Sequence, residues 1–172
     1  MNLDNKTQRL KVYYFQITDI WKRHCELHSE LFDLTCDEYA LLLESDLDNL
    51  EEKITQKNNL IATIKLNDEE RSRLLTDLAK AYPESKIEKV TDLITFFGEF
   101  PAEKESKHLF RFNALLLDII SKIQTQNKKN QLFINKAINS LRNIREEATG
   151  TTTVSTYNAK GVRSNRTLEQ NA

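Results

Sequence analysis

Hydrophobic residues in the first half of the chain recur at helical spacing. One series alternates steps of three and four residues, which places its members on one face of a helix: Leu10, Tyr13, Ile17, Ile20, His24, Leu27, Leu31 and Leu34. A second series follows in a different phase: Ala40, Leu43, Leu47, Leu50, Ile54, Lys57, Ile61 and Ile64. Thr35 and Glu38 stand at capping-box spacing where the phase changes. This predicts a kink, stutter or helix restart near Cys36.

Two further pairs at capping-box spacing predict helix starts. They are Asn67 with Glu70, and Ser85 with Glu88. Pro83 is expected to end the first of these helices, and Gly98 with Pro101 the second. The second helix is therefore short, with an apolar face made of Ile87, Val90, Ile94 and Phe97.

The last helical segment has an interrupted apolar face. Residues 102–149 contain neither glycine nor proline, which predicts one long helix. Its face begins with Leu109, Phe112, Leu116, Ile119 and Ile123. Residues 124–131, QTQNKKNQ, then lack any hydrophobic side chain over about 12 Å of helix. We expect this octapeptide to be a soft joint, because packing supplies most helix stability.

No segment carries the alternation expected of a strand. We therefore predict an all-α fold, an antiparallel bundle of long helices with short connections. Residues 1–148 form the predicted bundle domain. Residues 149–172 are polar, contain Gly150 and Gly161, and are predicted to be a disordered, flexible tail.

Charge is distributed unevenly along the chain. Residues 25–52 contain ten acidic residues and no Lys or Arg, whereas residues 119–172 contain nine basic and three acidic residues. Either the acidic first helix and the basic last helix lie side by side, or the basic end meets an acidic partner. Nucleic acid is not expected as a partner, because no aromatic platform accompanies the basic residues. The lack of a long apolar run and of a signal peptide favours a cytoplasmic protein that does not span the membrane.

The sequence offers little catalytic or metal-binding chemistry. His24 and His28 share a helix face near Cys25, but no third ligand has fitting spacing, so we expect no metal site and a packed core histidine at position 24. Cys25 and Cys36 are expected to be ordinary thiols. No phosphate loop, GxSxG elbow or HExxH motif occurs. We expect no enzyme activity, no cofactor and no small-molecule substrate.

Apolar residues return after the polar octapeptide and spread over more than one helix face. We predict that they form a docking surface for an amphipathic helix. The predicted surface consists of Phe133, Ile134, Ala137, Ile138, Leu141 and Ile144, with Leu132 beside it. The alternative is that residues 132–144 pack on the acidic first block as part of the core.

Tyr157 is the one aromatic residue of the predicted tail. Val154 and Val162 flank it, and Lys160 and Arg163 follow. A tyrosine in such a segment can fill a pocket with its ring and bind one polar partner through its hydroxyl.

Two parts of the chain resemble the FlgN-type flagellar export chaperones. LLLESDLDNLEEKITQKNNLIATIK at 41–65, followed by ERSRLL at 70–75, resembles the leading long helix of that family. NALLLDIISKIQ at 113–124, with STYNAKG at 155–161, is similar to its last helix and its terminal tyrosine motif. The chain departs from the pattern at Asn158, where Asp is frequent, and in the aromatic residues of its first 30 positions.

The resemblance implies a cytosolic all-α chaperone of flagellar type III protein export. By implication it binds the helical C-terminal segments of the hook-filament junction (hook-associated) proteins, prevents their premature assembly, and delivers them to the cytosolic domain of the export gate at the membrane. It implies that Tyr157 and Gly161 contact the gate, and it implies no cofactor. Two alternatives stay open: a structural coiled-coil or adaptor protein that dimerises through residues 40–64, and a secretion chaperone with unrelated cargo.

Overall fold

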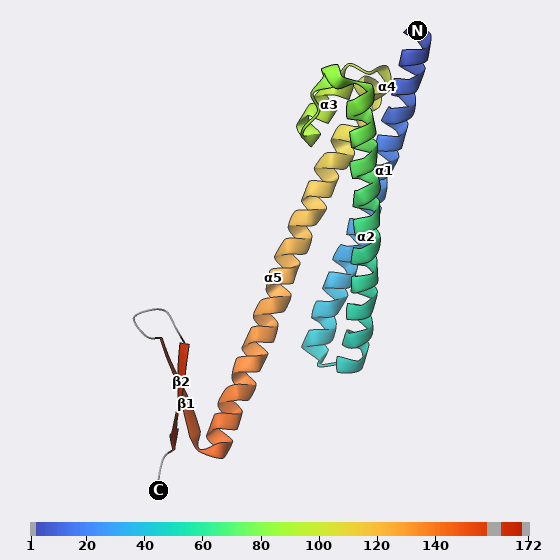
Figure 1. The fold of residues 1–172 in the computed structure, drawn as a ribbon. Helices are drawn as coiled ribbons and strands as arrows, with labels where there is room; N and C mark the ends of the chain where they lie inside the picture. Colours follow the sequence, from blue (N-terminus) through green and yellow to red (C-terminus); the bar gives the residue numbers. More distant parts are fainter. Residues whose placement is uncertain (1–2, 158–162, 170–172) are drawn as a thin grey trace. The chain divides into compact units, whose positions relative to one another are not determined.

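The structure is a computed structural model that describes residues 3–157 and 163–169. Its elements follow the order α1, α2, η1, α3, α4, α5, β1 and β2. The chain separates into two compact units, residues 1–128 and residues 129–172. The first unit holds α1 to α4 and the start of α5, and the second holds the rest of α5 and both strands (Figure 1).

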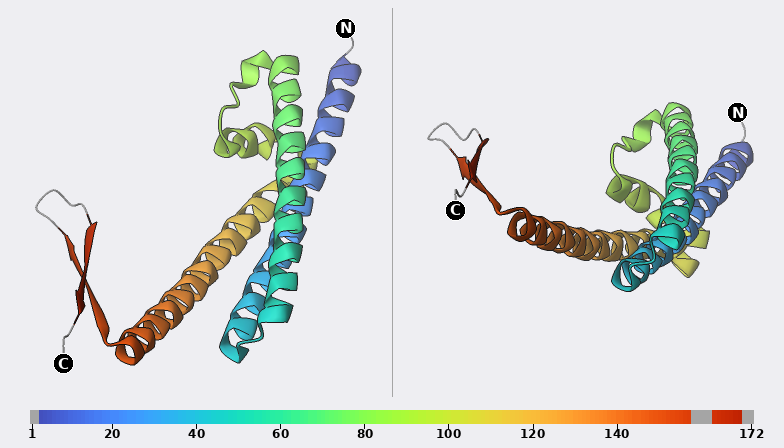
Figure 2. Two further views of the ribbon diagram at one scale, coloured as in Figure 1. Left: turned by 60° about the horizontal axis from the view of Figure 1, so that its bottom comes forward. Right: turned by 90° about the horizontal axis from the view of Figure 1, so that it is seen from below.

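Two long helices form the frame of the first unit. α1 (Leu3–Glu44) and α2 (Leu47–Ala81) lie side by side and antiparallel in each view (Figures 1 and 2). The turn between them contains Ser45, whose φ of 57° reverses the chain, and Asp46. The Asp46 side chain caps α2 by accepting a hydrogen bond from the backbone N–H of Asn49 at 3.2 Å.

The predicted helix restart near Cys36 is wrong, because α1 continues to Glu44. The alternatives of a kink or a stutter within the continuous helix stay predictions. Thr35 does not cap a new helix: it is fully buried, and its hydroxyl donates to the carbonyl of Leu31 at 2.7 Å, one turn earlier in the same helix. The predicted restart at Asn67 is also wrong, since α2 passes through it without interruption. The change of phase therefore marks a change of packing face within continuous helices.

Three short helical segments connect α2 to α5. They are the 3₁₀ turn η1 (Pro83–Ser85), α3 (Val90–Gly98) and α4 (Pro101–Ser106). The predicted start at Ser85 is wrong: the residue belongs to η1, and α3 begins after Lys89. Asp92 stabilises that start by accepting hydrogen bonds from the backbone N–H groups of Glu88 and Lys89 at 3.2 and 2.9 Å.

α5 (His108–Thr149) begins later than the expected 102–149 helix. Lys107 interrupts the helix with a φ of 52°, which separates α4 from α5. The buried Glu103 then caps α5: one carboxylate oxygen accepts from the N–H of Leu109 and the other from the N–H of Phe110, both at 3.0 Å. A carboxylate at a helix N-terminus satisfies free N–H groups and is favoured by the helix dipole.

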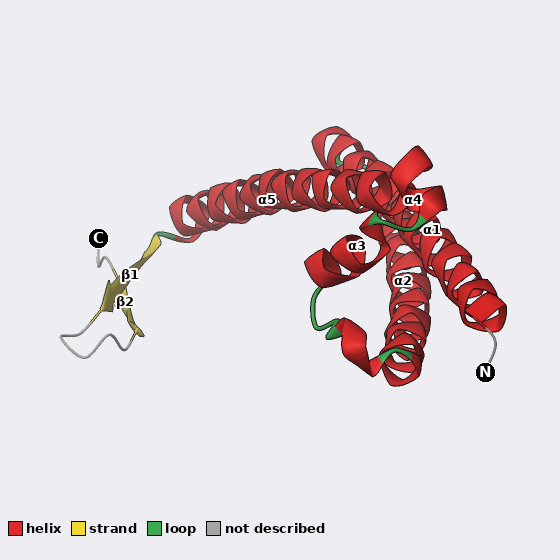
Figure 3. Cartoon of the chain, turned by 90° about the horizontal axis from the view of Figure 1, so that it is seen from above, coloured by secondary structure: helices red, strands yellow, loops and turns green. Residues whose placement is uncertain are grey.

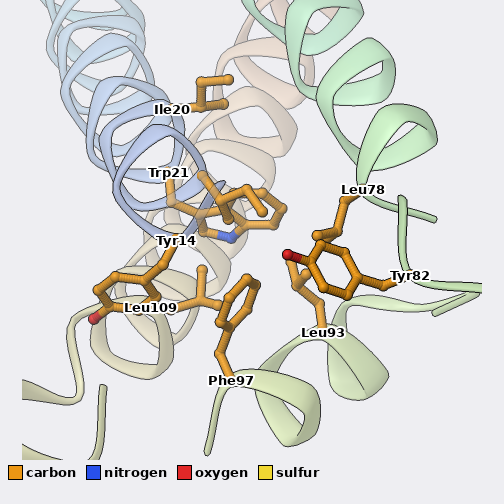
Figure 4. Packing of buried hydrophobic residues seen from close by; sticks show 9 residues of the cluster. Tyr14, Ile20, Trp21, Leu78, Tyr82, Leu93, Phe97 and Leu109 are labelled. Atoms are coloured by element: carbon orange, nitrogen blue, oxygen red, sulfur yellow. The ribbon is translucent and has the colours of Figure 1, made fainter. Parts of the chain in front are cut away.

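Aromatic residues of α1 build the centre of the first unit. Tyr14 and Trp21 are almost fully buried, and their rings lie near Leu109 of α5 and Phe97 of α3 (Figure 4). The buried cluster consists of Tyr14, Ile17, Ile20, Trp21, Leu78, Tyr82, Leu93, Phe97 and Leu109. The N-terminal aromatic residues, whose role the family pattern left undefined, therefore hold α1, α2, α3 and α5 together.

A smaller cluster joins the three long helices further along. It consists of Leu27 and Leu31 of α1, Leu60 of α2 and Ile123 of α5. Leu109 lies near the Tyr14 level of α1, and Ile123 near the Leu31 level. Within this unit α5 therefore runs parallel to α1 and antiparallel to α2, which confirms the predicted all-α bundle.

The second unit contains a β-hairpin where the sequence predicted an unstructured tail. β1 (Thr151–Tyr157) pairs with β2 (Arg163–Glu169) in antiparallel register, with Val154 opposite Arg166 (Figure 3). The expectation of no strands is corrected for these residues. The run TTTVSTY is rich in β-branched residues, which favour extended backbone, and their polar character concealed that preference.

The predicted boundary between the bundle domain and the tail, at residues 148 and 149, stays a prediction. α5 ends at Thr149, next to that boundary, whereas the division into compact units follows Lys128. Lys128 lies inside the polar octapeptide 124–131. The backbone of this octapeptide is helical throughout.

Candidate functional site

The predicted docking residues lie on the part of α5 that belongs to the second unit. We call residues 132–144 the distal α5 segment. Its large apolar side chains are exposed: Leu132 by 61%, Ile138 by 49%, Leu141 by 67% and Ile144 by 61%. Ala137 is also exposed, while Phe133 and Ile134 are half-buried. Four exposed aliphatic side chains within 13 residues make an apolar surface of the kind that normally marks a partner site.

Basic residues accompany this apolar surface. Lys128 and Lys129 precede the distal α5 segment, Lys136 lies within it, and Arg142 and Arg145 lie near its end. All five side chains are exposed. The segment is therefore a basic amphipathic helix, suited to a partner that combines apolar residues with negative charge.

A cleft of about 460 Å³ opens between α1, α2 and α5 in the first unit. Its apolar wall comes from α2 and α5: Ile61, Ile64, Leu116, Leu117 and Ile120. Its polar end contains His24, His28, Asp68 and Arg71. The sequence indicated His24 as a core residue, but periodicity alone did not show that a cleft adjoins it.

His24 is buried without a hydrogen-bond partner on either ring nitrogen. Its Nε2 lies 3.9 Å from Oδ1 of Asp68, which is beyond hydrogen-bonding distance. Burial lowers the pKa of His24 below its ordinary value of 6.5, and the charges of His28 and Arg71 act in the same direction. His24 is thus held as a neutral imidazole beside the cleft.

Arg71 connects the polar end of the cleft to the aromatic core. Its guanidinium lies 5.6 Å from the centre of the Trp21 ring and forms an ion pair with Asp68 at 2.6 Å. The indole N–H of Trp21 donates to the side-chain oxygen of Asn113 at 3.4 Å. These contacts fix side chains of α1, α2 and α5 around the cleft.

Cys25 is a buried cysteine on the side of α1 that faces α5. Burial raises the pKa of its thiol. The Cys25 thiol donates to the carbonyl of Phe112 at 3.2 Å. In the part of the chain that the structure describes, no three His, Cys, Asp or Glu side chains are grouped as a metal site would require.

The structure describes one of the two residues that are predicted to contact the export gate. Tyr157 is the last residue of β1, and its backbone is opposite Arg163 in the hairpin. Gly161 lies outside the described residues. Tyr157 and the distal α5 residues belong to different elements, β1 and α5.

No helix among the described residues is long and apolar enough to cross a membrane. A family model described as "FlgN protein" matches residues 13–165, from the first third of α1 into β2. Neither a curated protein nor a solved structure matches the chain.

Proposed function

The chain belongs to the FlgN family of flagellar export chaperones, and from this premise we propose that it escorts the hook-filament junction proteins. It binds their helical C-terminal segments, prevents premature assembly and delivers them to the export gate at the membrane. It acts in the cytoplasm as part of type III protein export, without a cofactor and without catalysis.

The exposed apolar surface of the distal α5 segment is the observation that carries this proposal. Ile138, Leu141 and Ile144 recur at steps of three, and all three are exposed on a continuous helix. A partner helix can cover such a face in the helix-in-groove mode. The proposed cargo-binding residues are Phe133, Ile134, Ala137, Ile138, Leu141 and Ile144.

Capture without tight caging suits an export chaperone, since the cargo must leave again. The distal α5 segment belongs to a single helix, and the polar octapeptide 124–131 lies between it and Ile123, the last residue of α5 in the buried clusters. Binding therefore adds contacts to a segment that contributes no residue to the buried clusters of the first unit. The bundle keeps its fold when the cargo dissociates.

Calorimetric titration tests the cargo proposal. The full chain is titrated with the C-terminal helical segment of a hook-filament junction protein and, as a control, with a segment of the same composition in scrambled order. Saturable binding of the native segment alone supports the proposal. Failure to bind any junction-protein segment, with intact helical circular dichroism, would exclude these cargos and leave an unrelated secretion cargo as the alternative.

Tyr157 and Gly161 are proposed as the contact with the cytosolic domain of the export gate. The support is the resemblance of residues 155–161 to the family's terminal tyrosine motif, together with the end position of Tyr157 in β1.

Tyr157→Ala should abolish gate docking and cargo secretion while cargo affinity is retained, because the two sites are separate segments. Titration of this variant against the gate domain and against cargo measures both. Wild-type affinity for the gate would refute the assignment, and parallel loss of both affinities would place the tyrosine in the cargo site.

A further inference from the structure

α2 carries a second apolar face that the buried clusters do not use. Leu47, Ile54 and Ile61 are exposed by 71%, 42% and 45%, and they recur every seven residues. The neighbouring Leu60 is buried and points to a different face. We call the three exposed residues the α2 row. It spans about 21 Å of helix, and its seven-residue spacing is that of a coiled-coil position, which fits a helix lying along α2.

Uncompensated negative charge surrounds the end of the α2 row nearest the α1–α2 turn. Glu44, Asp48, Glu51 and Glu52 are all exposed there. The nearest cations on α2 are already engaged: Lys53 pairs with Asp37 at 2.9 Å and Lys57 with Glu38 at 2.6 Å. Positive charge on an approaching helix is therefore favoured, and negative charge is repelled.

The chain itself carries a helix of the required chemistry. The distal α5 segment exposes apolar side chains along about 18 Å of helix, a length close to that of the α2 row. Lys136 and Arg142 are exposed cations within it, and Lys128, Lys129 and Arg145 are exposed cations beside it. Apolar character, length and charge thus match between the α2 row and the distal α5 segment.

We propose that the distal α5 segment of one copy docks on the α2 row of a second copy of this chain. Each copy carries both surfaces, so two reciprocal contacts close a two-fold dimer. The contact buries the aliphatic side chains of both helices and places the cations of α5 against the carboxylates near the α1–α2 turn. The regulatory effect rests on the proposed function: the dimer covers the cargo-binding face of α5, so cargo and the second copy compete for it.

Paired charge reversals test this contact by sedimentation velocity of the full chain over a concentration series. Glu51→Lys with Glu52→Lys should weaken self-association at least tenfold, and so should Arg142→Glu with Arg145→Glu. An equimolar mixture of the two double variants should associate again, because each reversed surface then meets an opposite charge. Glu69→Lys with Glu70→Lys is the matched control, since it makes the same change on α2 about 27 Å from that site.

Three results would overturn the proposal: a wild-type chain that stays monomeric at all concentrations, a dimer that neither reversal weakens, and variants that do not recover on mixing. A dimer that neither charge reversal weakens would indicate that the two copies contact each other through the same surface. A dimer that binds cargo without dissociating would remove the regulatory effect. Cargo titration of the same variants is read separately, so a monomer that binds cargo overturns self-association and leaves the proposed function standing.

Discussion

The hydroxyl of Tyr14 donates a hydrogen bond to Oε2 of Glu103 at 2.8 Å, although the residues are 89 positions apart in the sequence. The same carboxylate accepts the N–H groups of Leu109 and Phe110. Burial raises the pKa of Tyr14, so its phenol stays a proton donor. One buried acid thereby joins α1, α4 and the N-terminus of α5.

Replacing this acid should destabilise the bundle. Glu103→Gln keeps the size of the side chain but turns one acceptor oxygen into a donor, which faces other donors. We expect a loss of about 1 to 3 kcal/mol in the free energy of unfolding, measured by urea denaturation. Glu99→Gln, at an exposed position paired with Lys104, is the control and should change little. Equal stability of the two variants would contradict the capping role.

His24 should make the bundle less stable in mild acid. Its pKa is lowered in the folded state, so below about pH 6.5 the unfolded chain binds more protons than the folded chain. The stabilisation from neutral His24 is complete above that pH and is lost as pH falls. His24→Leu should therefore reduce the difference between the thermal midpoints at pH 7.5 and pH 5.5. The exposed His108→Gln should leave that difference unchanged, and an equal effect of both substitutions would argue against this account.

The apolar residues of the distal α5 segment should be dispensable for folding and necessary for cargo capture. Ile138→Asp with Leu141→Asp should leave the thermal midpoint nearly unchanged, because both side chains are exposed. Cargo binding in the titration described above should be lost. Ile123→Asp on the same helix is the matched control: burial there is worth about 1.5 to 3 kcal/mol, so this variant should be destabilised. Unfolding of the double variant would identify residues 138 and 141 as core.

The polar octapeptide 124–131 should open locally in the free protein. Of the four residues in the smaller cluster, α5 supplies Ile123 alone, just before the octapeptide, and the compact units divide inside it. Amide exchange should be fast across residues 124–131 and beyond, and should slow when cargo binds. Uniform protection from Leu109 to Ile144 without cargo would indicate a rigid helix and would count against the joint.

The sequence predicted which helix faces are buried more reliably than it predicted where each helix begins and ends. The first apolar series identified Ile17, Ile20, Leu27 and Leu31, which are buried, because burial follows helical periodicity directly. Capping boxes were less informative. Thr35 matched the pattern of a cap, but in a buried helix its hydroxyl bonds to the preceding turn. Asp46, which does cap α2, stood within an acidic run that concealed it.

The sequence also did not show which apolar helix faces are exposed. Periodicity grouped Leu47, Ile54 and Ile61 with Leu50 and Ile64, although one side of the helix is exposed and the other is packed. The sequence of one helix does not show whether another helix covers its apolar face. The cleft beside His24 was equally hidden, because it depends on how far apart α2 and α5 lie. Such features require the packed structure.

The hydrogen bond between Tyr14 and Glu103 can form only late in the synthesis of these residues, because they are far apart in the sequence. The central cluster needs Tyr14 together with Phe97 and Leu109, so it cannot close until Leu109 has left the ribosome. At about 5 to 20 residues per second, Leu109 emerges roughly 5 to 20 s after Tyr14. During that interval the nascent chain has only the α1–α2 hairpin to shelter Trp21 and its aromatic neighbours. The ten acidic residues at positions 25–52 give this unfinished chain a negative region, and like charges disfavour association between copies of it.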